Sequence, residues 1–410
     1  MRILVLSNLY PPHKIGGYEV RCQQVCDLLR SFGHELRVLT SDHRVPQIET
    51  EEEAHVGRRL KIHGFYGHPW LPIHRLYPQE HENQKILREE IQEFQPEVVH
   101  VWNMGGLSKA LLLALEAGDI PVQYDISDHW IARSLRGDVW LSWWNDEGSA
   151  GRKFLRTLLQ TTGLRSLLSK QVPTASWDRL QWKRIYFCSA FMRELTASKG
   201  WPVEHAEVIY CGVETGKFSE KADWSRFERL LFVGRLNQDK DPLTAVRALA
   251  LARKTRPELQ LHLYGGGEPA YLDTLQQEAE KLGVADAIEL KSVSAHEMRH
   301  VYSDYDALLF TSNWGEPFAL TPLEAMASGL PVVLCPDGGD AELGRDGENC
   351  LLATAGEPSS VAQGILRLAE SEALREQLAL HALEEVRRLY DLTPIARQIE
   401  AALQQTASSS

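Results

Sequence analysis

The sequence predicts an α/β protein with two doubly wound parallel sheets, each covered by helices on both faces. Two observations lead to this fold class. Short apolar runs alternate with amphipathic segments of helical period, and the alternation restarts in the second half of the 410 residues. A chain of this length is also too long for one ordinary core, which favours two domains. We expect two Rossmann-like domains that face a central cleft.

Residues 1–204 are predicted to form the N-terminal domain. The segment RILVLSN reads as a buried strand, and a loop with Gly16 and Gly17 follows it. The next segment, YEVRCQQVCDLLRSFG, has apolar residues at helical spacing, and further strands are expected in HELRVLTSD, PEVVHVWN and IPVQYDIS. This alternation indicates a parallel sheet with crossover helices.

Residues 205–390 are predicted to form the C-terminal domain. Strands are expected in HAEVIYCGV, RLLFVGRL, LQLHLYGGG, AIELKS, YDALLFTS and PVVLCPDGG, with helices between them. The segment 391–410 is predicted to be a C-terminal helix that crosses back to the N-terminal domain. In doubly wound sheets, ligands bind beyond the carboxyl ends of the strands, so the loops at those ends are the places to search for a site.

The segment 131–185 interrupts the alternation of predicted strands and helices, and it is rich in tryptophan and in basic residues. Between Arg152 and Arg184 the chain carries eight Lys or Arg residues and a single acid, Asp178. One interpretation is a helical insertion with a solvated basic face. The other is a surface for an anionic acceptor or an anionic lipid interface, where tryptophan is favoured because its ring is apolar and its N–H is polar.

Composition limits the possible partners. The formal net charge of −12 argues against nucleic acid as a partner. No apolar run is long enough to span a bilayer, and the N-terminal run is too short for a signal peptide. We therefore expect a cytoplasmic protein, in possible peripheral contact with the inner face of the membrane. The six cysteines lie mostly in apolar runs and are interpreted as core residues.

The stretch GEPFALTPLE contains two glutamates, Glu316 and Glu324, on either side of an apolar bridge. Thr321, Pro322 and Glu324 fit a capping box, which would give Glu324 a purely structural role. This explanation does not extend to Glu316, which follows a predicted strand. The helix expected to start near Thr321 would also direct free N–H groups and the positive end of its dipole at the same place, which suits a phosphate.

Two further loops offer groups for an anionic ligand. Arg235 and Lys240 follow the strand LLFVG, and two cations there could hold a diphosphate. Glycine pairs follow two other strands and would let a ligand approach the backbone closely, although a plain turn is the favoured explanation for such a run taken alone. These pairs are Gly16 with Gly17, and Gly265 with Gly266.

These motifs together resemble a known family. The segments IGGYEVRCQQVCDLLRSFGHELRVLTSD, VIYCGVE, FVGRLNQDKDP, LYGGGEPAYLDTL and EPFALTPLEAMASGLPVV are similar to the successive motifs of glycosyltransferase family four, the retaining enzymes of GT-B fold with an E-x7-E segment. The resemblance covers nearly the whole chain and is weakest over 131–185. It implies transfer of a sugar from a nucleoside-diphosphate sugar to an acceptor hydroxyl in glycan, polysaccharide or glycoconjugate biosynthesis, with the configuration at the anomeric carbon retained.

The resemblance also implies roles for individual residues. Arg235 and Lys240 would grip the donor diphosphate, Glu316 would lie against the donor sugar, and Glu324 would hold the ribose hydroxyls. The N-terminal domain would bind the acceptor, which could be a saccharide, a lipid-linked sugar or another small molecule. No metal or other cofactor is expected, because the cations and the helix end would neutralise the diphosphate. The remaining donor contacts implied are Gly16, Gly17, Gly265, Gly266, Phe318, Ala319, Leu320 and Thr321.

Three departures from the family pattern stand out. Ala319 and Asp241 lie where the family often has glycine. Ser127 and Asp128 occupy the place of the usual His-Asp pair, and His129 comes one residue later. Either His129 or Asp128 would then do the polar work at this position, or His129 would be structural. Two other functions stay open: a sugar-nucleotide epimerase on the same scaffold, and a non-catalytic sugar-nucleotide binder.

Overall fold

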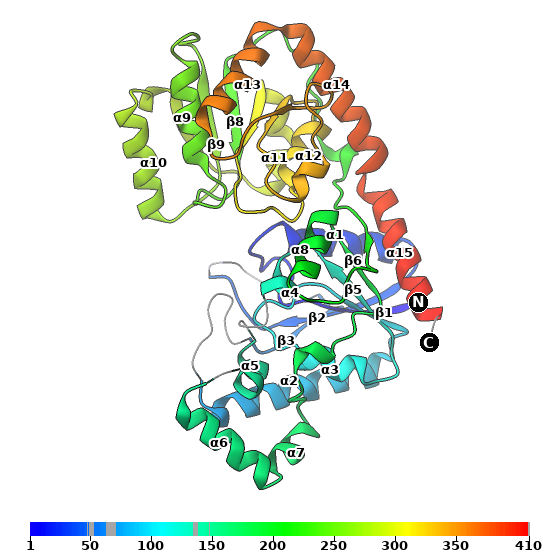
Figure 1. The fold of residues 1–410 in the computed structure, drawn as a ribbon. Coiled ribbons are helices and arrows are strands. Elements are labelled where there is room, and N and C mark those ends of the chain that lie inside the picture. The colour runs from blue at the N-terminus through cyan, green and yellow to red at the C-terminus, as the bar shows by residue number, and fades with distance from the viewer. Residues whose placement is uncertain (47, 49–52, 63–70, 134–137, 147, 409–410) are drawn as a thin grey trace. The chain divides into compact units, whose positions relative to one another are not determined.

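A computed structural model describes residues 1–46, 48, 53–62, 71–133, 138–146 and 148–408, and the chain divides into two compact units (Figure 1). Unit 1 contains residues 1–209 and 396–410, and unit 2 contains residues 210–395.

In unit 1 the elements are β1 (Arg2–Leu6), α1 (Gly17–Ser31), β2 (Glu35–Ser41), β3 (Val56–Leu60), α2 (Ile73–Phe94), β4 (Val98–Val101), α3 (Ala110–Glu116), β5 (Val122–Ile126), α4 (Trp130–Arg133), α5 (Val139–Asn145), α6 (Ala150–Thr161), α7 (Leu164–Ser169), η1 (Trp177–Arg179), β6 (Ile185–Phe187), α8 (Ala190–Ser198) and β7 (Glu207–Val208).

Unit 1 is built on a parallel sheet of seven strands in the order β3-β2-β1-β4-β5-β6-β7. All of β4 and residues Ile3–Leu6 of β1 are buried, as expected where helices cover a sheet on both sides. The chain leaves β1 toward β2 on one side and returns to β4 on the other. The switch point of the sheet, where ligand sites form in such folds, therefore lies between β1 and β4.

Unit 2 contains a second parallel sheet, with six strands in the order β10-β9-β8-β11-β12-β13. Its switch point lies between β8 and β11. The two sheets confirm the predicted fold class of two Rossmann-like α/β domains. The elements of unit 2 are η2 (Thr215–Lys217), β8 (Arg229–Val233), α9 (Pro242–Ala252), β9 (Gln260–Tyr264), α10 (Pro269–Lys281), η3 (Ala285–Ala287), β10 (Ile288–Lys291), α11 (Ala295–Val301), η4 (Tyr302–Asp304), β11 (Ala307–Phe310), α12 (Leu320–Ala327), β12 (Val332–Leu334), η5 (Gly339–Glu342), β13 (Leu351–Leu352), α13 (Pro358–Glu370) and α14 (Glu372–Leu389).

The junction between the units differs from the expected position. The sequence suggested that HAEVIYCGV opens the second domain at residue 205. In the structure, β7 pairs with β6 and closes the sheet of unit 1, so the junction lies between residues 209 and 210. The last helix, α15 (Leu392–Ser408), runs from unit 2 into unit 1. There Thr406 donates a hydrogen bond of 2.7 Å to the buried Gln123 of β5.

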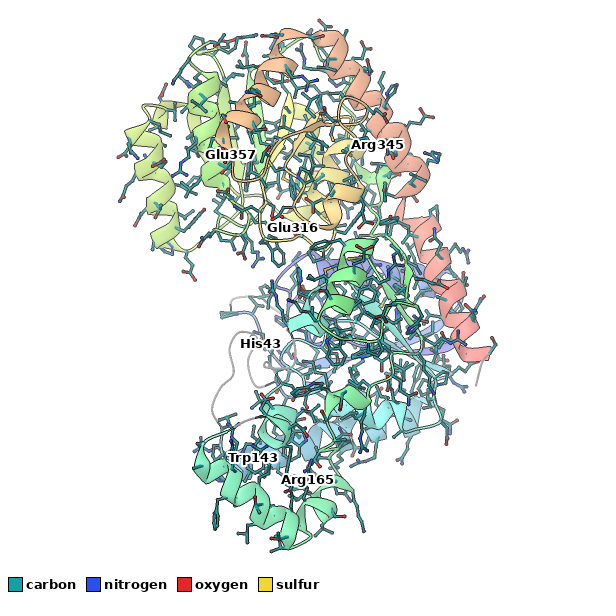
Figure 2. The ribbon with its side chains drawn as sticks, in the orientation of Figure 1. His43, Trp143, Arg165, Glu316, Arg345 and Glu357 are labelled. Atoms are coloured by element: carbon teal, nitrogen blue, oxygen red, sulfur yellow. The ribbon has the colours of Figure 1, made fainter. Side chains whose placement is uncertain are left out.

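The described part of the 131–185 segment is helical, and it corrects one expectation. The tryptophans Trp140, Trp143 and Trp144 are no more than 5% exposed and form a core cluster with Leu76 of α2. They pack inside the unit and hold α5 against α2, so they do not form a polar–apolar interface. Figure 2 labels Trp143 within this cluster.

Two other expectations concern membrane spans and cysteines. In the part of the chain that the structure describes, no helix has both the length and the apolar composition needed to cross a bilayer. All six cysteines are buried and unbridged, which agrees with their interpretation as small core residues.

Candidate functional site

The loops that follow β8 and β11 meet at the switch point of unit 2. Lys240 comes from the first loop and Glu316 from the second, and the Nζ atom of Lys240 forms an ion pair with Oε1 of Glu316 (Figure 2 labels Glu316). Ser312 also donates a hydrogen bond of 2.6 Å to the same carboxylate oxygen. Glu316 is only 4% exposed. The sequence assigned these two residues to different parts of a ligand, and the structure brings them into direct contact.

Local hydrogen bonds fix Lys240 in this position. Its backbone N–H donates to Oδ1 of Asn237 at 3.2 Å, and Asp241 begins α9 as the N-cap. Asp241 has φ +47°, a left-handed conformation that favours glycine, which fits the family preference noted above. Its carboxylate compensates by accepting hydrogen bonds from the backbone N–H and the hydroxyl of Thr244, at 3.2 and 2.6 Å.

Arg235 lies in the same loop and has a different environment. Its side chain is exposed. Among the residues that the structure describes, no carboxylate or other acceptor binds its guanidinium. The next residue, Leu236, donates its backbone N–H to the carbonyl of Gly266 at 2.8 Å, which ties this loop to the glycine run after β9. The backbone next to Arg235 is therefore held in place, and its guanidinium remains available to an anion.

The two predicted glycines after β9 are not equivalent. A Cβ atom on Gly265 would lie 1.9 Å from the carbonyl oxygen of Gly234, and the φ of Gly265 is +152°. Packing alone therefore requires glycine at 265, as in the plain-turn interpretation. At Gly266 a Cβ would meet no atom within 4 Å. Since neither packing nor a positive φ explains Gly266, its lack of a side chain leaves space at the carboxyl end of the sheet.

The helix that follows Glu316 starts earlier than predicted. The first helical residue of α12 is Leu320, and Ala319 is the N-cap with φ −78° and ψ 128°. Thr321 and Pro322 are thus the second and third helical residues, and the predicted capping box does not form. No side chain caps this helix. Because Pro322 has no N–H, the amides of Leu320 and Thr321 are the donors that the first turn leaves without an intrahelical partner.

The other residues around α12 have defined packing roles. The ring of Phe318 is 6% exposed and lies 5.2 Å from the ring of Tyr210 and 5.7 Å from that of Tyr390. Only the backbone of Phe318 could contact a ligand. Ala319 adopts an ordinary backbone conformation, so its replacement of glycine adds no strain.

Glu324 does not cap the helix, contrary to the structural interpretation. Its Oε2 accepts a hydrogen bond of 2.6 Å from the hydroxyl of Tyr302. Burial raises the pKa of its carboxyl above the usual value for glutamate. The side chain is partly exposed, and only one of its acceptor sites has this partner, so it can accept from a further hydroxyl.

Sequence reasoning missed Asp340, a buried acid beside Glu316. The loop after β12 lies on the Glu316 backbone, with hydrogen bonds from Glu316 N–H to Asp337 at 2.8 Å and from Gly339 N–H to Glu316 at 2.7 Å. Asp340 follows this contact, is fully buried, and has no hydrogen-bond partner for Oδ1 among the described residues. Burial, and then the charge of Glu316, raise its pKa to about 7. The run PDGGD could have indicated Asp340 as a site residue, because it directly follows a strand that the sequence predicts to be buried.

In unit 1 the glycine pair lies at the start of α1. Gly17 is the first helical residue and Gly16 is the N-cap. The carboxylate of Glu19 accepts from Gly16 N–H at 2.9 Å and from Ile15 N–H at 3.3 Å, which holds the turn. Gly16 has φ −152°, open to any residue, and a Cβ there would meet no atom within 4 Å. As at Gly266, packing does not require glycine here, and the missing side chain leaves open space next to the backbone.

Asp128 and His129 follow β5, at the same end of the sheet. Oδ1 of Asp128 accepts the backbone N–H of His129 at 2.6 Å, just before α4 begins. After burial, the charge of Asp128 contributes to the raised pKa of Glu19, so the two acids are electrostatic neighbours. The side chain of His129 is 5% exposed. Of the two, Asp128 is the more accessible.

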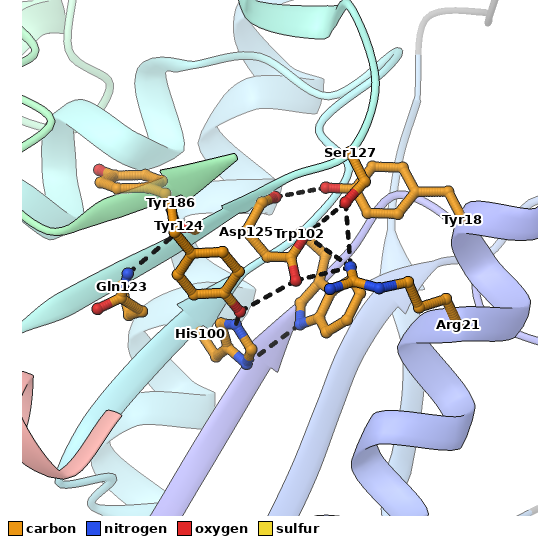
Figure 3. A network of polar contacts seen from close by, with 9 residues as sticks. All are labelled: Tyr18, Arg21, His100, Trp102, Gln123, Tyr124, Asp125, Ser127 and Tyr186. Carbon is orange, nitrogen blue, oxygen red and sulfur yellow. Dashed lines mark hydrogen bonds and ion pairs between the residues drawn. The ribbon is translucent and has the colours of Figure 1, made fainter. Parts of the chain in front are cut away.

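Asp125, which precedes this pair, belongs to a closed network (Figure 3). Its two oxygens accept from Nη1 of Arg21 at 2.9 and 2.8 Å, and both side chains are at most 1% exposed. Tyr186 donates to the same carboxylate at 3.0 Å and contacts Nε2 of His100 at 2.9 Å. Burial lowers the pKa of His100 to about 3, with a further contribution from Arg21. The neutral ring accepts from Trp102 through Nδ1, so Nε2 carries the proton.

Comparisons with known proteins agree with this arrangement. Residues 15–217 match the model described as "Glycosyltransferase Family 4", and residues 217–384 match "Glycosyl transferases group 1". An uncharacterized glycosyltransferase of Methanocaldococcus jannaschii is 23% identical, with 97% of this chain and 96% of that protein covered.

Solved structures show the same fold. Sucrose-phosphate synthase from Thermosynechococcus elongatus has a TM-score of 0.72 at 18% identity, with both chains fully covered. HepE of Anabaena, solved with UDP-glucose, has a TM-score of 0.66 at 20% identity and covers 99% of this chain and 100% of its own. From the two family models and these neighbours, the chain belongs to the family-four glycosyltransferases of GT-B fold.

Proposed function

We propose that unit 2 binds the nucleoside-diphosphate sugar and that the enzyme transfers the sugar with retention at the anomeric carbon. One observation carries this proposal: an ion pair, a free guanidinium and an uncapped helix start converge at the switch point of one sheet. Lys240, Arg235 and the amides of Leu320 and Thr321 supply positive charge from three directions. That arrangement suits an extended anion such as a diphosphate.

The diphosphate would be neutralised as it departs. When the bond between the anomeric carbon and the phosphate oxygen breaks, negative charge grows on that oxygen. Arg235 and Lys240 are positioned to stabilise this charge without moving far, which is the electrostatic form of catalysis. The acceptor oxygen then bonds to the same carbon, and its proton passes to the departing diphosphate. We propose that this requires no metal, since two cations and a helix dipole serve the leaving group.

The two glutamates, Glu316 and Glu324, would contact the sugar and the ribose of the donor respectively. Glu316 holds Lys240 in place through its ion pair and presents its second oxygen toward the sugar. Glu324 has acceptor capacity left beside Tyr302 and would bind the ribose hydroxyls. Gly266 leaves the backbone accessible. The complex of HepE with UDP-glucose supports a sugar nucleotide as the donor class.

In unit 1 we propose contacts with the acceptor side of the reaction. The open turn at Gly16 and Gly17 would admit a substrate group, and Asp128 would orient the acceptor hydroxyl, with His129 in a supporting position behind it. The acceptor would be a saccharide, a lipid-linked sugar or another small hydroxyl compound. A peripheral contact with a membrane belongs to the same proposal.

The test begins with a thermal-shift screen of nucleoside diphosphates and their sugars. We expect one base to stabilise the wild-type protein. Arg235→Ala should weaken binding of that nucleotide by roughly 10- to 150-fold in calorimetry, because one charge-assisted contact is lost. NMR of the product should then show the anomeric configuration of the donor. Inverted product would refute retention, and unchanged binding by the variant would refute the diphosphate site.

A further inference from the structure

The helices α6 and α7 leave an unusual amount of apolar surface uncovered. Thirteen large apolar side chains are exposed in the described part of the chain, and five of them lie between positions 154 and 167. Phe154 is 72% exposed and Leu167 is 61% exposed. The two helices pack against each other and have no fully buried residue. We call the five side chains the α6–α7 face: Phe154, Leu155, Leu158, Leu164 and Leu167.

Other side chains of the two helices attach them to unit 1. Leu159 and Leu168 pack against the tryptophan cluster. The guanidinium of Arg156 donates to the carbonyls of Trp144 and Asp146, each at 2.8 Å. Arg165, labelled in Figure 2, donates to Thr174 at 3.2 and 2.8 Å. These contacts already anchor α6 and α7, so the α6–α7 face contributes nothing to the core of the unit.

Basic side chains border this face. Arg152 and Lys153 precede Phe154, and Lys170 follows α7. Within the described residues, none of the three forms an ion pair, although they belong to a chain of net charge −12. Arg156 and Arg165 are occupied with Thr174 and with backbone carbonyls, so the cations that border the face without an ion pair are Arg152, Lys153 and Lys170. A helix with an exposed apolar face and flanking lysines is typical of segments that lie in a bilayer interface.

We propose that the α6–α7 face docks onto an anionic lipid bilayer, with Phe154 and the four leucines in the outer acyl region and Arg152, Lys153 and Lys170 at the headgroups. Charge complementarity selects this occupant. An acidic protein is repelled by an anionic surface unless a basic region faces it, and 152–184 carries eight basic residues against one acid. Phe154 takes the inserting role that the sequence suggested for the tryptophans.

The experiment uses the whole protein and vesicles, without donor or acceptor. Flotation is measured with phosphatidylcholine vesicles that contain about one third phosphatidylglycerol and with pure phosphatidylcholine vesicles. We expect the wild type to bind the anionic vesicles, more weakly as salt rises, and not the neutral ones. The double variant Phe154→Gln, Leu158→Gln should lower the partition coefficient by at least about tenfold. Lys153→Gln and Lys170→Gln should lower it by about fivefold each.

The matched control is the double variant Leu380→Gln, Leu389→Gln in α14. These leucines are 46% and 42% exposed, close to Leu158 at 46%. Vesicle binding by this control should equal that of the wild type. The proposal is overturned if the wild type does not bind anionic vesicles, or if the α6 double variant binds as well as the wild type. It is also overturned if ultracentrifugation shows a dimer that the α6 variant dissociates, because the face would then join two copies of the chain.

Vesicle binding is independent of glycosyl transfer. The inference rests on the proposed function in one respect only: a lipid-linked acceptor would give the enzyme a reason to bind a bilayer. Nucleotide binding by the α6 double variant should match that of the wild type in calorimetry, because these residues lie far along the chain from the loops of unit 2. A failure of vesicle binding would leave the donor site intact, and a failure of donor binding would leave the lipid contact intact.

Discussion

The carboxyl ends of the two sheets contain similar residues in different environments. In unit 1, Arg21 and Asp125 are fully buried and form an ion pair with each other, and Tyr186 and His100 extend the network. In unit 2, the guanidinium of Arg235 and Oδ1 of Asp340 have no partner among the described residues. A buried polar atom without a partner, such as Oδ1 of Asp340, is rare in native proteins and calls for an explanation. We propose that the first cluster supports the fold and that the second serves a ligand.

The largest expected effect concerns stability in unit 1. Arg21→Met leaves the Asp125 carboxylate buried without its cation, which should lower the free energy of unfolding by about 3–5 kcal/mol. The comparison variant is Lys61→Met, whose pair with Asp42 is exposed at both ends, 49% and 40%. That variant should change the free energy by less than about 1 kcal/mol. Urea titration followed by tryptophan fluorescence measures both, and equal effects would contradict the scaffold role.

The next effect concerns activity in unit 2. Glu316→Gln keeps the size of the side chain and an acceptor for Ser312, but it removes the charge that pairs with Lys240. Transfer should fall by at least about 100-fold, as when a group that stabilises developing charge is lost. The exposed Glu289 provides the control, because Glu289→Gln should leave transfer unchanged. Near wild-type turnover by Glu316→Gln would show that the carboxylate has no part in the reaction.

Asp340 allows a test of pH dependence. Its pKa is raised from 3.8 to about 7 in the folded protein, so the ionised carboxyl destabilises the fold above pH 7. Wild-type stability should therefore rise as the pH falls from about 7 toward 4, as the folded state takes up a proton. Asp340→Asn cannot ionise and should be more stable than the wild type at pH 8, by on the order of 2 kcal/mol. Thermal unfolding at pH 8 and pH 5 measures this gap, and a gap that does not shrink at pH 5 would exclude the raised pKa.

The smallest effect separates the two glycines after β9. Gly265→Ala should lower the melting temperature by several degrees, because its Cβ would lie 1.9 Å from a carbonyl oxygen. Gly266→Ala should leave the melting temperature nearly unchanged and weaken nucleotide binding several-fold. Differential scanning fluorimetry with and without nucleotide gives both quantities. Equal destabilisation by the two substitutions would mean that Gly266 also serves packing.

Periodicity predicted the fold because each strand is a short apolar run and each helix has an amphipathic stripe. Short sequence motifs were less reliable predictors of structure where the same residues are compatible with two different local structures. TPLE at 321–324 fits a capping box, yet the helix begins at Leu320 with Ala319 as its N-cap, so Thr321 and Glu324 both lie inside it. Likewise, the sequence placed Glu207 and Val208 in the second domain, but they form β7 and pair with β6 of the first sheet. This pairing depends on contacts between residues distant in sequence, which a local pattern does not record.

Site prediction had a similar limit. Lys240 and Glu316 were found individually from the loops they occupy, but their ion pair depends on β8 and β11 being neighbours in the sheet. Asp340 was missed because its raised pKa arises from burial under a loop packed on Glu316, which no local pattern records. One of the two interpretations of the 131–185 segment placed its tryptophans at an interface because that composition is typical of one. The burial of Trp140, Trp143 and Trp144 instead follows from packing against α2.

The path of α15 has a consequence for biosynthesis. Unit 2 is inserted between two stretches of unit 1, and the two crossings lie together, with hydrogen bonds from Val213 to Tyr390 and from Leu392 to Val213. The unit that the ribosome makes first is therefore finished last, when residues 396–408 emerge. Until then the nascent first domain lacks its closing helix, while the second can already fold as a unit.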